Sequence, residues 1–584
     1  MYLTTPWAGE TRADIPLPEY PRPQMVRPHW QCLNGLWQYR LAGPTRRREG
    51  EIQVPFAVET GASQVSERFL PEDVLTYSRA VVNPWPGRRV RLHFEAVDHH
   101  CRVLVDGVPA AEHTGGYLPF SLDLPDAPRW RLDVEVTDPT DAGLQQRGKQ
   151  SLEPQGIWYT ATSGIWGTVW LEPLPDNAIT RVLADTRPGL DGFEITVDTE
   201  RPTDVDVTVE LPDGYAIAAT GRAGEPLSVH LPSAKPWSPE DPHLYPLRVT
   251  AGDDEVRSYA GLRTIGIGPL DGAPGAVPAV LLNGRPILLN TPLDQGYWPQ
   301  SGMTPPSDKA LLHDLTTLKD LGFNGLRMHI KVASRRWYHH ADRLGLLVVQ
   351  DMVNGGKPAV GLRGSGVVQA TGWRWGDRSR VARRANGRDD AANRAAFREE
   401  LAGMVEHLRV HPSIVCWVPF NESWGQFDAR GIAEMVRRLD PTRLIDHASG
   451  WFDQGAGDFR SRHRYVLALK PPPRRDKRPF YLSEFGGYNL AVPGHVWSET
   501  EKFGYRHFDD RESLAAGLTQ LWREQLIPLV AKGLRAAVYT QVSDVEIETN
   551  GLMTYDRKVL KVDPALMRQL NSELYAALQA LAAP

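Results

Sequence analysis

His411-Pro-Ser-Ile-Val-Cys-Trp-Val-Pro-Phe-Asn421-Glu422 is the stretch of sequence that decides the fold. Its apolar run is typical of a buried strand, and the run ends abruptly in an Asn-Glu pair. In a barrel of parallel strands, catalytic side chains are presented at the C-terminal strand ends. Glu422 is therefore a candidate catalytic carboxylate.

The same pattern recurs in Phe480-Tyr-Leu-Ser-Glu484-Phe-Gly-Gly487, where a short apolar strand delivers a second Glu into a Gly-containing turn. A single Glu after a strand is often a helix starter or a salt-bridge partner. The joint occurrence of Glu422 and Glu484 is the specific signal, because glycoside hydrolysis commonly uses two carboxyl groups that flank one bond. The pair predicts a glycosidase.

The N-terminal part of the chain, up to about residue 266, is predicted to be all-β. Runs such as Val90–Phe94 and Leu132–Val136 alternate apolar and polar side chains, and Asp106-Gly107 is a hairpin signal. We predict a jelly-roll β-sandwich over residues 1–175. A second, shorter set of strands over residues 176–266 has the size of an immunoglobulin-like sandwich.

From residue 267 to residue 584 strands and helices alternate, which predicts a (β/α)8 TIM barrel. Ser307 is placed to cap one helix, and Phe397, Leu401 and Leu408 belong to the apolar stripe of another. The predicted barrel strands are Ile287–Asn290, Gly322–Met328, Leu346–Gln350, Ile414–Pro419, Leu444–His447, Tyr465–Leu469, Phe480–Ser483 and Ala536–Gln541.

The composition of the chain limits the kinds of binding partner that we expect. The formal net charge of -5 gives no reason to expect broad attraction to nucleic acid or to an anionic membrane. The 3 cysteines are too few and too far apart for a disulfide framework or a zinc knuckle, which favours buried thiols. With no signal-like N-terminus, we expect a cytoplasmic protein. The oligomeric state is open, and a homo-oligomer is compatible with the sequence.

The motifs together resemble glycoside hydrolase family 2, the β-galactosidase and β-glucuronidase group. The two Glu motifs carry the resemblance, and Asn34-Gly35-Leu36-Trp37, the run from Gly156 to Leu171, and Leu282-Asn283-Gly284-Arg285-Pro286 also fit it. The resemblance implies that Glu422, after the fourth strand, is the acid/base. It implies that Glu484, after the seventh strand, is the nucleophile of a retaining enzyme.

These roles predict the distance between the two carboxyl groups and the protonation state of each. In a retaining glycosidase the two carboxyl groups lie about 5 to 5.5 Å apart. Glu484 must be ionised to attack, and a nearby cation or hydrogen-bond donor would favour that state. Glu422 must begin protonated, which burial and a neighbouring negative charge favour.

The resemblance and the strand-end positions also give a candidate sugar-binding shell, and most of its members have an alternative structural role. Asn421 can donate to a sugar 2-hydroxyl or hold the turn. Arg327 either stabilises the ionised nucleophile or forms a structural salt bridge, and Tyr465 either hydrogen-bonds the nucleophile or is merely packed. The remaining candidates are His329, His463, Asp294, Asp351, Trp424, Trp451, Trp298 and Gln541.

We therefore predict a retaining exo-glycoside hydrolase that removes a non-reducing terminal sugar, β-galactoside-like first. The chain has no Asn-x-Lys sequence, the feature that glucuronidases of this family use to hold a carboxylate, so glucuronides are disfavoured. The alternatives are a non-catalytic carbohydrate-binding protein, a transglycosylase or a furanosidase. No metal or other cofactor is predicted. The stretch 354–390 is predicted to be a lid, a binding element or disordered.

Overall fold

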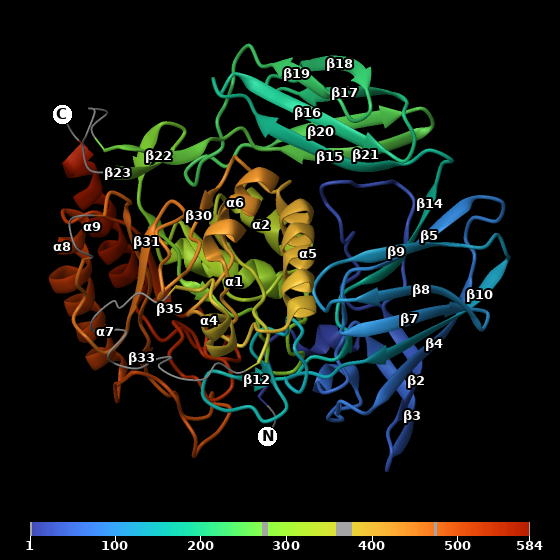
Figure 1. Cartoon of the computed structure of the whole chain (residues 1–584), viewed down its shortest axis with the longest axis horizontal. Coiled ribbons are helices and arrows are strands. Elements are labelled where there is room, and N and C mark those ends of the chain that lie inside the picture. Colours follow the sequence, from blue (N-terminus) through green and yellow to red (C-terminus); the bar gives the residue numbers. More distant parts are fainter. Residues whose placement is uncertain (1–2, 271–277, 358–375, 472–475, 583–584) are drawn as a thin grey trace.

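The computed structural model describes residues 3–270, 278–357, 376–471 and 476–582. They form three parts that follow one another along the chain, namely an N-terminal β-sandwich, a second sandwich and a C-terminal barrel (Figure 1). The predicted multidomain fold class is confirmed. The smaller sandwich lies above both of its neighbours in this view.

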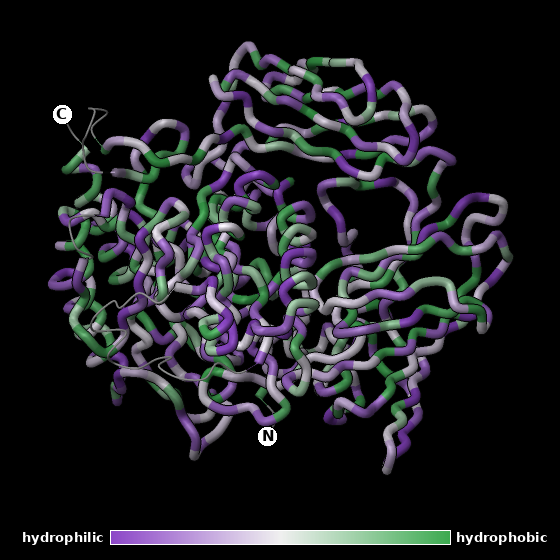
Figure 2. Tube along the Cα trace, in the orientation of Figure 1, coloured by the Kyte–Doolittle hydropathy of each residue, from purple (hydrophilic) through white to green (hydrophobic). Residues whose placement is uncertain are grey.

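The N-terminal sandwich consists of two antiparallel sheets around one apolar core. In β10, every second side chain points inward, which places Trp130, Leu132 and Val134 in the core. Figure 2 shows hydrophobic and hydrophilic residues mixed along the strands of this sandwich. The first sheet has the order β1 (Gln31–Cys32), β14 (Val169–Leu174), β5 (Arg89–Phe94) and β9 (Phe120–Leu124). The second has the order β3 (Arg47–Val54), β2 (Gly35–Ala42), β4 (Val74–Val82), β10 (Arg129–Thr137), β7 (His100–Val105) and β8 (Val108–Thr114).

Four short strands extend this sandwich. β6 (Val97–Asp98) pairs with β13 (Gly164–Ile165), and β11 (Gln150–Ser151) pairs with β12 (Tyr159–Thr160). The predicted hairpin at Asp106-Gly107 joins β7 to β8, and both turn residues have the positive φ angles, 52° and 80°, that a two-residue hairpin of this type requires. Short 3₁₀ turns lie at η1 (Ala8–Arg12) and η2 (Gly61–Ser63).

The second sandwich has its own apolar core between two antiparallel sheets. One has the order β15 (Ile179–Thr186), β16 (Gly192–Thr199) and β19 (Pro226–His230). The other has the order β18 (Ala216–Arg222), β17 (Asp204–Glu210), β20 (Tyr245–Ala251) and β21 (Asp254–Ala260). Just after it, buried Arg263 donates to the carbonyl oxygens of Pro412 at 2.8 Å and Ile414 at 2.5 Å. These bonds attach the sandwich to the start of the fourth barrel strand.

The barrel strands pair in parallel throughout. One sheet has the order β25 (Leu289–Asn290), β35 (Leu534–Thr540), β32 (Phe480–Gly486) and β31 (Arg460–Arg464). The other has the order β26 (Leu293–Asp294), β27 (Gly325–Met328), β28 (Leu347–Asp351), β29 (Ile414–Val418) and β30 (Leu444–Ile445). β25 and β26 are successive pieces of the first strand, so this strand joins the two sheets. A small antiparallel sheet of β22 (Ile265–Pro269), β23 (Pro278–Leu282) and β24 (Arg285–Ile287) precedes the barrel.

Helices surround these strands, with their apolar stripes buried. The predicted cap is confirmed, because the Ser307 side chain accepts from the Ala310 N–H at the start of α1. The predicted stripe of α5, including Phe397 and Leu401, is buried. The helices are α1 (Asp308–Asp320), α2 (Arg335–Leu344), α4 (Arg380–Ala385), α5 (Ala391–Leu408), α6 (Ala429–Leu439), α7 (Arg511–Gln520), the π-helical η3 (Leu521–Leu526), α8 (Ile527–Val530) and α9 (Pro564–Ala582). A short pair, β33 (Tyr488–Asn489) and β34 (Arg506–His507), follows the seventh strand.

The sixth strand differs from the prediction. The sequence predicts Tyr465–Leu469, but the strand is β31, Arg460–Arg464, which has no apolar side chain. It is nevertheless largely buried, because Arg460 pairs with Asp453 and the Ser461 hydroxyl donates to Asp446 at 2.8 Å. Hydrophobic periodicity cannot detect a strand whose buried side chains are held by polar contacts.

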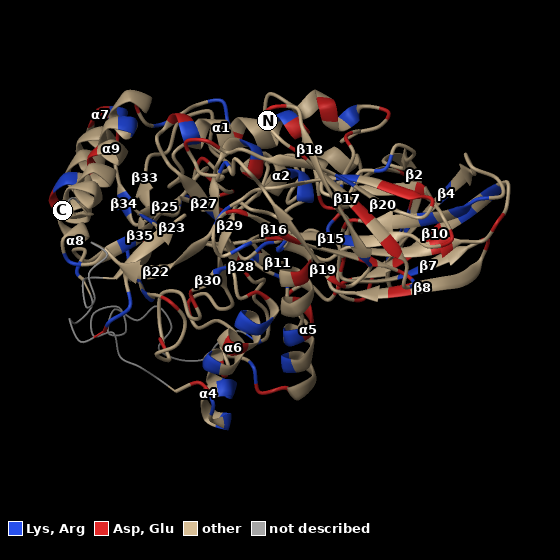
Figure 3. Cartoon of the chain, turned by 90° about the horizontal axis from the view of Figure 1, so that it is seen from above, with Lys and Arg blue, Asp and Glu red and all other residues tan. Residues whose placement is uncertain are grey.

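The stretch 354–390 was predicted to be a lid, a binding element or disordered. Its central residues, 358–375, lie outside the described residues, and the remainder contains α4. In the described part of the chain, no helix is both long and apolar enough to span a bilayer. The cysteines are free thiols; Cys101 and Cys416 are buried as predicted, whereas Cys32 is only partly buried. Figure 3 shows acidic and basic residues interspersed over all three parts, in keeping with the small net charge of -5.

Candidate active site

The two glutamates meet at the C-terminal ends of the barrel strands. Glu484 lies near the C-terminal end of β32, and Glu422 lies in the turn after β29. Glu422 and Ser423 adopt left-handed backbone with φ of 52° and 60°, and the Glu422 N–H donates to the Ser449 carbonyl at 2.9 Å. Such backbone costs about 1 kcal/mol or more per residue and is concentrated at functional sites. The turn therefore aims Glu422 back toward Glu484.

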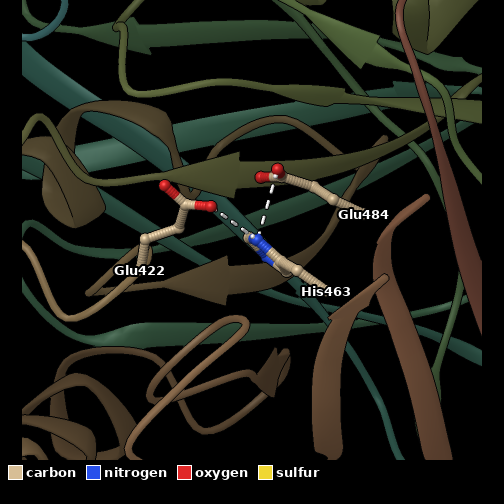
Figure 4. Close-up of side chains that lie close together, drawn as sticks. All are labelled: Glu422, His463 and Glu484. Carbon is tan, nitrogen blue, oxygen red and sulfur yellow. Dashed lines mark hydrogen bonds and ion pairs between the residues drawn. The ribbon is translucent and has the colours of Figure 1, made fainter. Parts of the chain in front are cut away.

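His463 bridges the two carboxylates (Figure 4). Its Nδ1 lies 3.0 Å from Glu422 Oε1 and 3.3 Å from Glu484 Oε2, and its Nε2 lies 3.2 Å from the Ser449 hydroxyl. One oxygen of each glutamate and one nitrogen of His463 all lie within 4.8 Å of one another. The carboxyl groups are thus close enough to act on one bond, as a retaining pair must be.

Arg327 lies beside Glu484 and contacts its carboxyl group. The guanidinium lies 3.3 Å from Glu484 Oε1 and donates to the Ser483 carbonyl at 2.8 Å. It also forms a double contact with Asp351, at 2.9 and 3.0 Å. Burial alone would lower the pKa of Arg327, but the carboxylates of Asp351 and Glu484 raise it above its usual value. A permanent positive charge therefore lies beside Glu484.

Tyr465 contacts the other oxygen of Glu484. Its hydroxyl donates to Glu484 Oε2 and lies 3.0 Å from the Thr540 hydroxyl, while its ring stacks on Tyr505 with centroids 3.9 Å apart. Burial first, and the Glu484 charge second, raise the pKa of Tyr465 well above its usual value. Tyr465 therefore stays a neutral donor, and the predicted contact with the candidate nucleophile is present.

Three further buried polar side chains, His329, Asp351 and Asn421, are connected to Arg327 and are here called the polar layer. His329 Nδ1 lies 2.8 Å from Asp351 Oδ2, which in turn holds Arg327. Burial lowers the pKa of His329 well below its usual value, with the charge of Lys149 the next largest cause. The Asn421 side-chain oxygen accepts from Arg327 at 2.9 Å. In the described part of the chain the Asn421 Nδ2 group has no protein acceptor, so it can still donate to a sugar.

Two of the predicted aromatic platforms lie beside the pair. Trp451 is almost buried, with its ring centroid 5.9 Å from that of His463. Trp424, two residues after Glu422, is packed edge to face against Trp158 of the N-terminal sandwich, with centroids 5.0 Å apart. The guanidinium carbon of Arg147 lies 5.3 Å from the centroid of the Trp424 ring. The N-terminal sandwich therefore reaches the catalytic end of the barrel.

Other predicted candidates are held elsewhere. Asp294 accepts from the Gly296 N–H at 2.8 Å, so it shapes its own turn and does not contact the glutamates. Trp298 is buried under Arg557, whose guanidinium carbon lies 4.1 Å from the centroid of the indole ring. A ring covered in this way is not a sugar platform.

Gln541 is fully buried at the end of the eighth strand. Its amide nitrogen donates to Asn550 at 2.8 Å, Asn550 donates to Glu548 at 2.9 Å, and the Tyr159 hydroxyl contacts Glu548. This chain of polar contacts runs from the barrel to the N-terminal sandwich. Gln541 therefore supports the wall of the site from behind.

The structure brings together most of the predicted set at one place. The residues in mutual contact are Glu422, Glu484, His463, Tyr465, Arg327, Asp351, His329 and Asn421. Sequence reasoning missed Ser449 and Thr540, which contact this group from after β30 and from the end of β35, and Tyr505, which stacks on Tyr465 from the segment just before β34. It also missed Lys149 and Trp158, because nothing in an all-β segment indicates contact with a distant barrel.

Glu422, His463 and Glu484 also offer the donor atoms of a divalent-cation site. Two observations favour hydrogen bonds instead. The His463 distances of 3.0 and 3.3 Å suit N–H to oxygen contacts. In addition, the guanidinium of Arg327 lies 3.3 Å from Glu484 and would repel a second cation.

A barrel with two converging glutamates, preceded by two sandwiches, is the architecture of a glycoside hydrolase. Two family models match the chain: "Glycosyl hydrolases family 2, TIM barrel domain" over residues 278–571, about half of the chain, and "Glycosyl hydrolases family 2" over residues 183–263. The chain belongs to glycoside hydrolase family 2, and the predicted resemblance is confirmed.

Individual relatives are distant. A β-galactosidase of Vibrio vulnificus (strain CMCP6) is 22% identical, with 81% of this chain and 49% of the relative covered. This chain thus spans about half the length of that relative. A β-glucuronidase of Paenibacillus borealis is 23% identical over 71% of this chain and 72% of the relative. The crystal structure of a β-galacturonidase from Eisenbergiella tayi bound to galacturonate has a TM-score of 0.67 and 19% identity, with 95% of this chain and 99% of that chain covered.

Proposed function

We propose that this protein is a retaining, exo-acting β-glycoside hydrolase. Glu484 attacks the anomeric carbon while Glu422 protonates the departing oxygen, which gives a covalent glycosyl-enzyme and a free alcohol. Glu422, now ionised, then removes a proton from water, and the water displaces Glu484. The observation that carries the proposal is the convergence of the two glutamates, within 4.8 Å, in unlike surroundings.

Those surroundings assign the roles. The Glu484 side chain is 5% exposed and is contacted by the guanidinium of Arg327 and the hydroxyl of Tyr465, which both stabilise a negative charge. The Glu422 side chain is 25% exposed, so it can exchange a proton with water between the two steps. This difference supports Glu484 as nucleophile and Glu422 as acid/base.

For the sugar, we propose a galacto-configured ring, in line with the β-galactoside expectation. The support is the match to a β-galactosidase over 81% of this chain. The Asn421 amide, oriented by Arg327, is placed to hold the sugar 2-hydroxyl, a contact that strengthens in the transition state.

A panel of 4-nitrophenyl glycosides tests the function. We expect nitrophenol release from at least one β-glycoside, and proton NMR should show that the first-formed sugar is the β anomer. Initial formation of the α anomer would exclude the double displacement. Sugar binding without release from any glycoside would favour the carbohydrate-binding alternative.

Replacing Tyr465 by Phe should lower kcat/KM by about 10- to 100-fold, because a hydrogen bond to a charged group typically contributes about 1.5–3 kcal/mol. Steady-state kinetics on the best nitrophenyl substrate measure this loss. Tyr481→Phe is the matched control: Tyr481 is also buried in the barrel, and among the described residues its hydroxyl has no hydrogen-bond partner. Equal activity of the two variants would remove Tyr465 from the mechanism.

A further inference from the structure

One segment of the N-terminal sandwich leaves its sheets and lies on the catalytic end of the barrel. It runs from residue 146 to residue 160 and contains β11 and β12; β12 is visible below the barrel in Figure 1. The Gly148 N–H donates to the Asn354 carbonyl at 3.0 Å, and Trp158 packs on Trp424. The segment, here called the sandwich loop, is therefore part of the wall around the active site.

Lys149 follows Gly148, at one of the contacts between the sandwich loop and the barrel. A Cβ atom added at Gly148 would lie 3.0 Å from the Ile330 carbonyl, directly after His329. The Lys149 ammonium lies 6.0 Å from the ring centroid of Tyr159. Its charge also acts on His329 more strongly than that of Arg327 does, although Arg327 and His329 share the same carboxylate. Lys149 is thus next to the polar layer under the two glutamates.

The Lys149 ammonium has no anionic partner in the described part of the chain. No side-chain hydrogen bond or ion pair is formed by it there, and the side chain is only partly exposed. The acids that contact its neighbours are already engaged: Asp351, beside His329, by Arg327 and His329, and Glu548, beside Tyr159, by Tyr159 and Asn550. A partly buried cation without a partner is costly, and a bound anion would offset this cost.

The chemistry of the site selects the kind of anion. Lys149 offers a single ammonium group. A phosphate or sulfate ester is usually bound by several donors at once. A carboxylate needs only one strong donor. The chain has no Asn-x-Lys sequence, so a donor to a sugar carboxylate has to be sought in another part of the chain, and Lys149 of the sandwich loop is the candidate.

We propose that Lys149 is a specificity-determining residue that binds a carboxylate on the terminal sugar. The hydrolase then prefers a galacto-configured uronide to the neutral galactoside. This inference rests on the proposed glycosidase function. It extends that function by assigning sugar selection to the N-terminal sandwich while the barrel performs bond cleavage.

The test compares kcat/KM for 4-nitrophenyl β-D-galacturonide, β-D-glucuronide and β-D-galactoside. We expect the wild type to prefer the galacturonide, and Lys149→Met to lower that rate constant by about 10- to 100-fold, as expected for loss of one charge-assisted hydrogen bond. Its effect on the galactoside should stay within about 3-fold. Lys149→Arg, which keeps the charge, should retain part of the preference. Lys309→Met, on the surface of α1, is the matched control.

Two results would overturn the assignment: a wild type that prefers the galactoside, or a Lys149→Met variant that loses both activities equally. Calorimetric binding of galacturonate to the Glu484→Ala variant separates this question from turnover. If no glycoside is cleaved, the glycosidase proposal fails. Lys149 is then judged by whether Lys149→Met weakens galacturonate binding, and unchanged binding rejects its role.

Discussion

Replacing Glu484 by Ala is expected to lower kcat by at least about 10⁴-fold, because the glycosyl-enzyme can no longer form. The fold should be preserved, since the Glu484 side chain only contacts Arg327, Tyr465 and His463 at the open end of the barrel. Release of nitrophenol measures the loss. Glu406→Ala, at an exposed position on α5, is the matched control and should keep full activity.

Chemical rescue makes this prediction specific to the nucleophile. Azide can occupy the space left by the missing carboxylate and attack the anomeric carbon directly, so the expected product of Glu484→Ala is the α-glycosyl azide, with inverted configuration. A β-glycosyl azide from this variant would mean that a nucleophile survives and that the roles of Glu484 and Glu422 are exchanged. Labelling of Glu422 by a mechanism-based fluorosugar would show the same exchange.

Replacing Glu422 by Ala should remove general acid and base catalysis, typically worth about 10² to 10⁴-fold in rate. The loss should depend on the leaving group. A 2,4-dinitrophenyl glycoside needs little protonation, so it should still form the glycosyl-enzyme, whereas an alkyl glycoside should react hardly at all. Because the second step also lacks its base, a burst of dinitrophenol followed by slow turnover is expected in stopped-flow experiments.

With the Glu422→Ala variant, azide should yield the β-glycosyl azide, because Glu484 still forms the intermediate and azide then displaces it. The opposite configurations from the two variants test both assignments at once. Equal losses on the dinitrophenyl and alkyl glycosides would contradict a proton-transfer role for Glu422.

The pairs of strand and turn that the sequence marks most strongly are the ones that the structure places at the active site. Glu422 and Glu484 follow apolar runs that can only be buried strands, and in a parallel barrel such strand ends converge by geometry. Arg327 and Tyr465 could be chosen for the same reason. The barrel places both residues near the strand ends, and both contact the Glu484 carboxyl group.

Polar interiors limit such predictions. The strand that carries His463 consists of Arg460-Ser-Arg-His-Arg464 and is inside because its own ion pairs and hydrogen bonds satisfy it. The hydropathy pattern of a sequence does not show which polar partners a buried side chain has. Its true position, five residues before the predicted one, became visible only through its pairing with β32.

Local contacts that depend on side-chain direction are also beyond the sequence. Gln541 follows the eighth strand, as an active-site residue would, but its amide is engaged with Asn550. Asp294 is similarly placed and engages the N–H of Gly296. Both have the right residue type at the right strand end; a neighbour engages the Asp294 carboxylate and the Gln541 amide nitrogen, while the Gln541 side-chain oxygen has no hydrogen-bond partner among the described residues.

The reach of the sandwich loop over the barrel also bears on how such proteins diversify. The residues that break the bond and the residue proposed to recognise the sugar are encoded in separate segments of the chain, the barrel strands and the sandwich loop. Recombination that exchanges the first of these segments between relatives could therefore transfer a sugar preference while the inherited reaction chemistry stays the same.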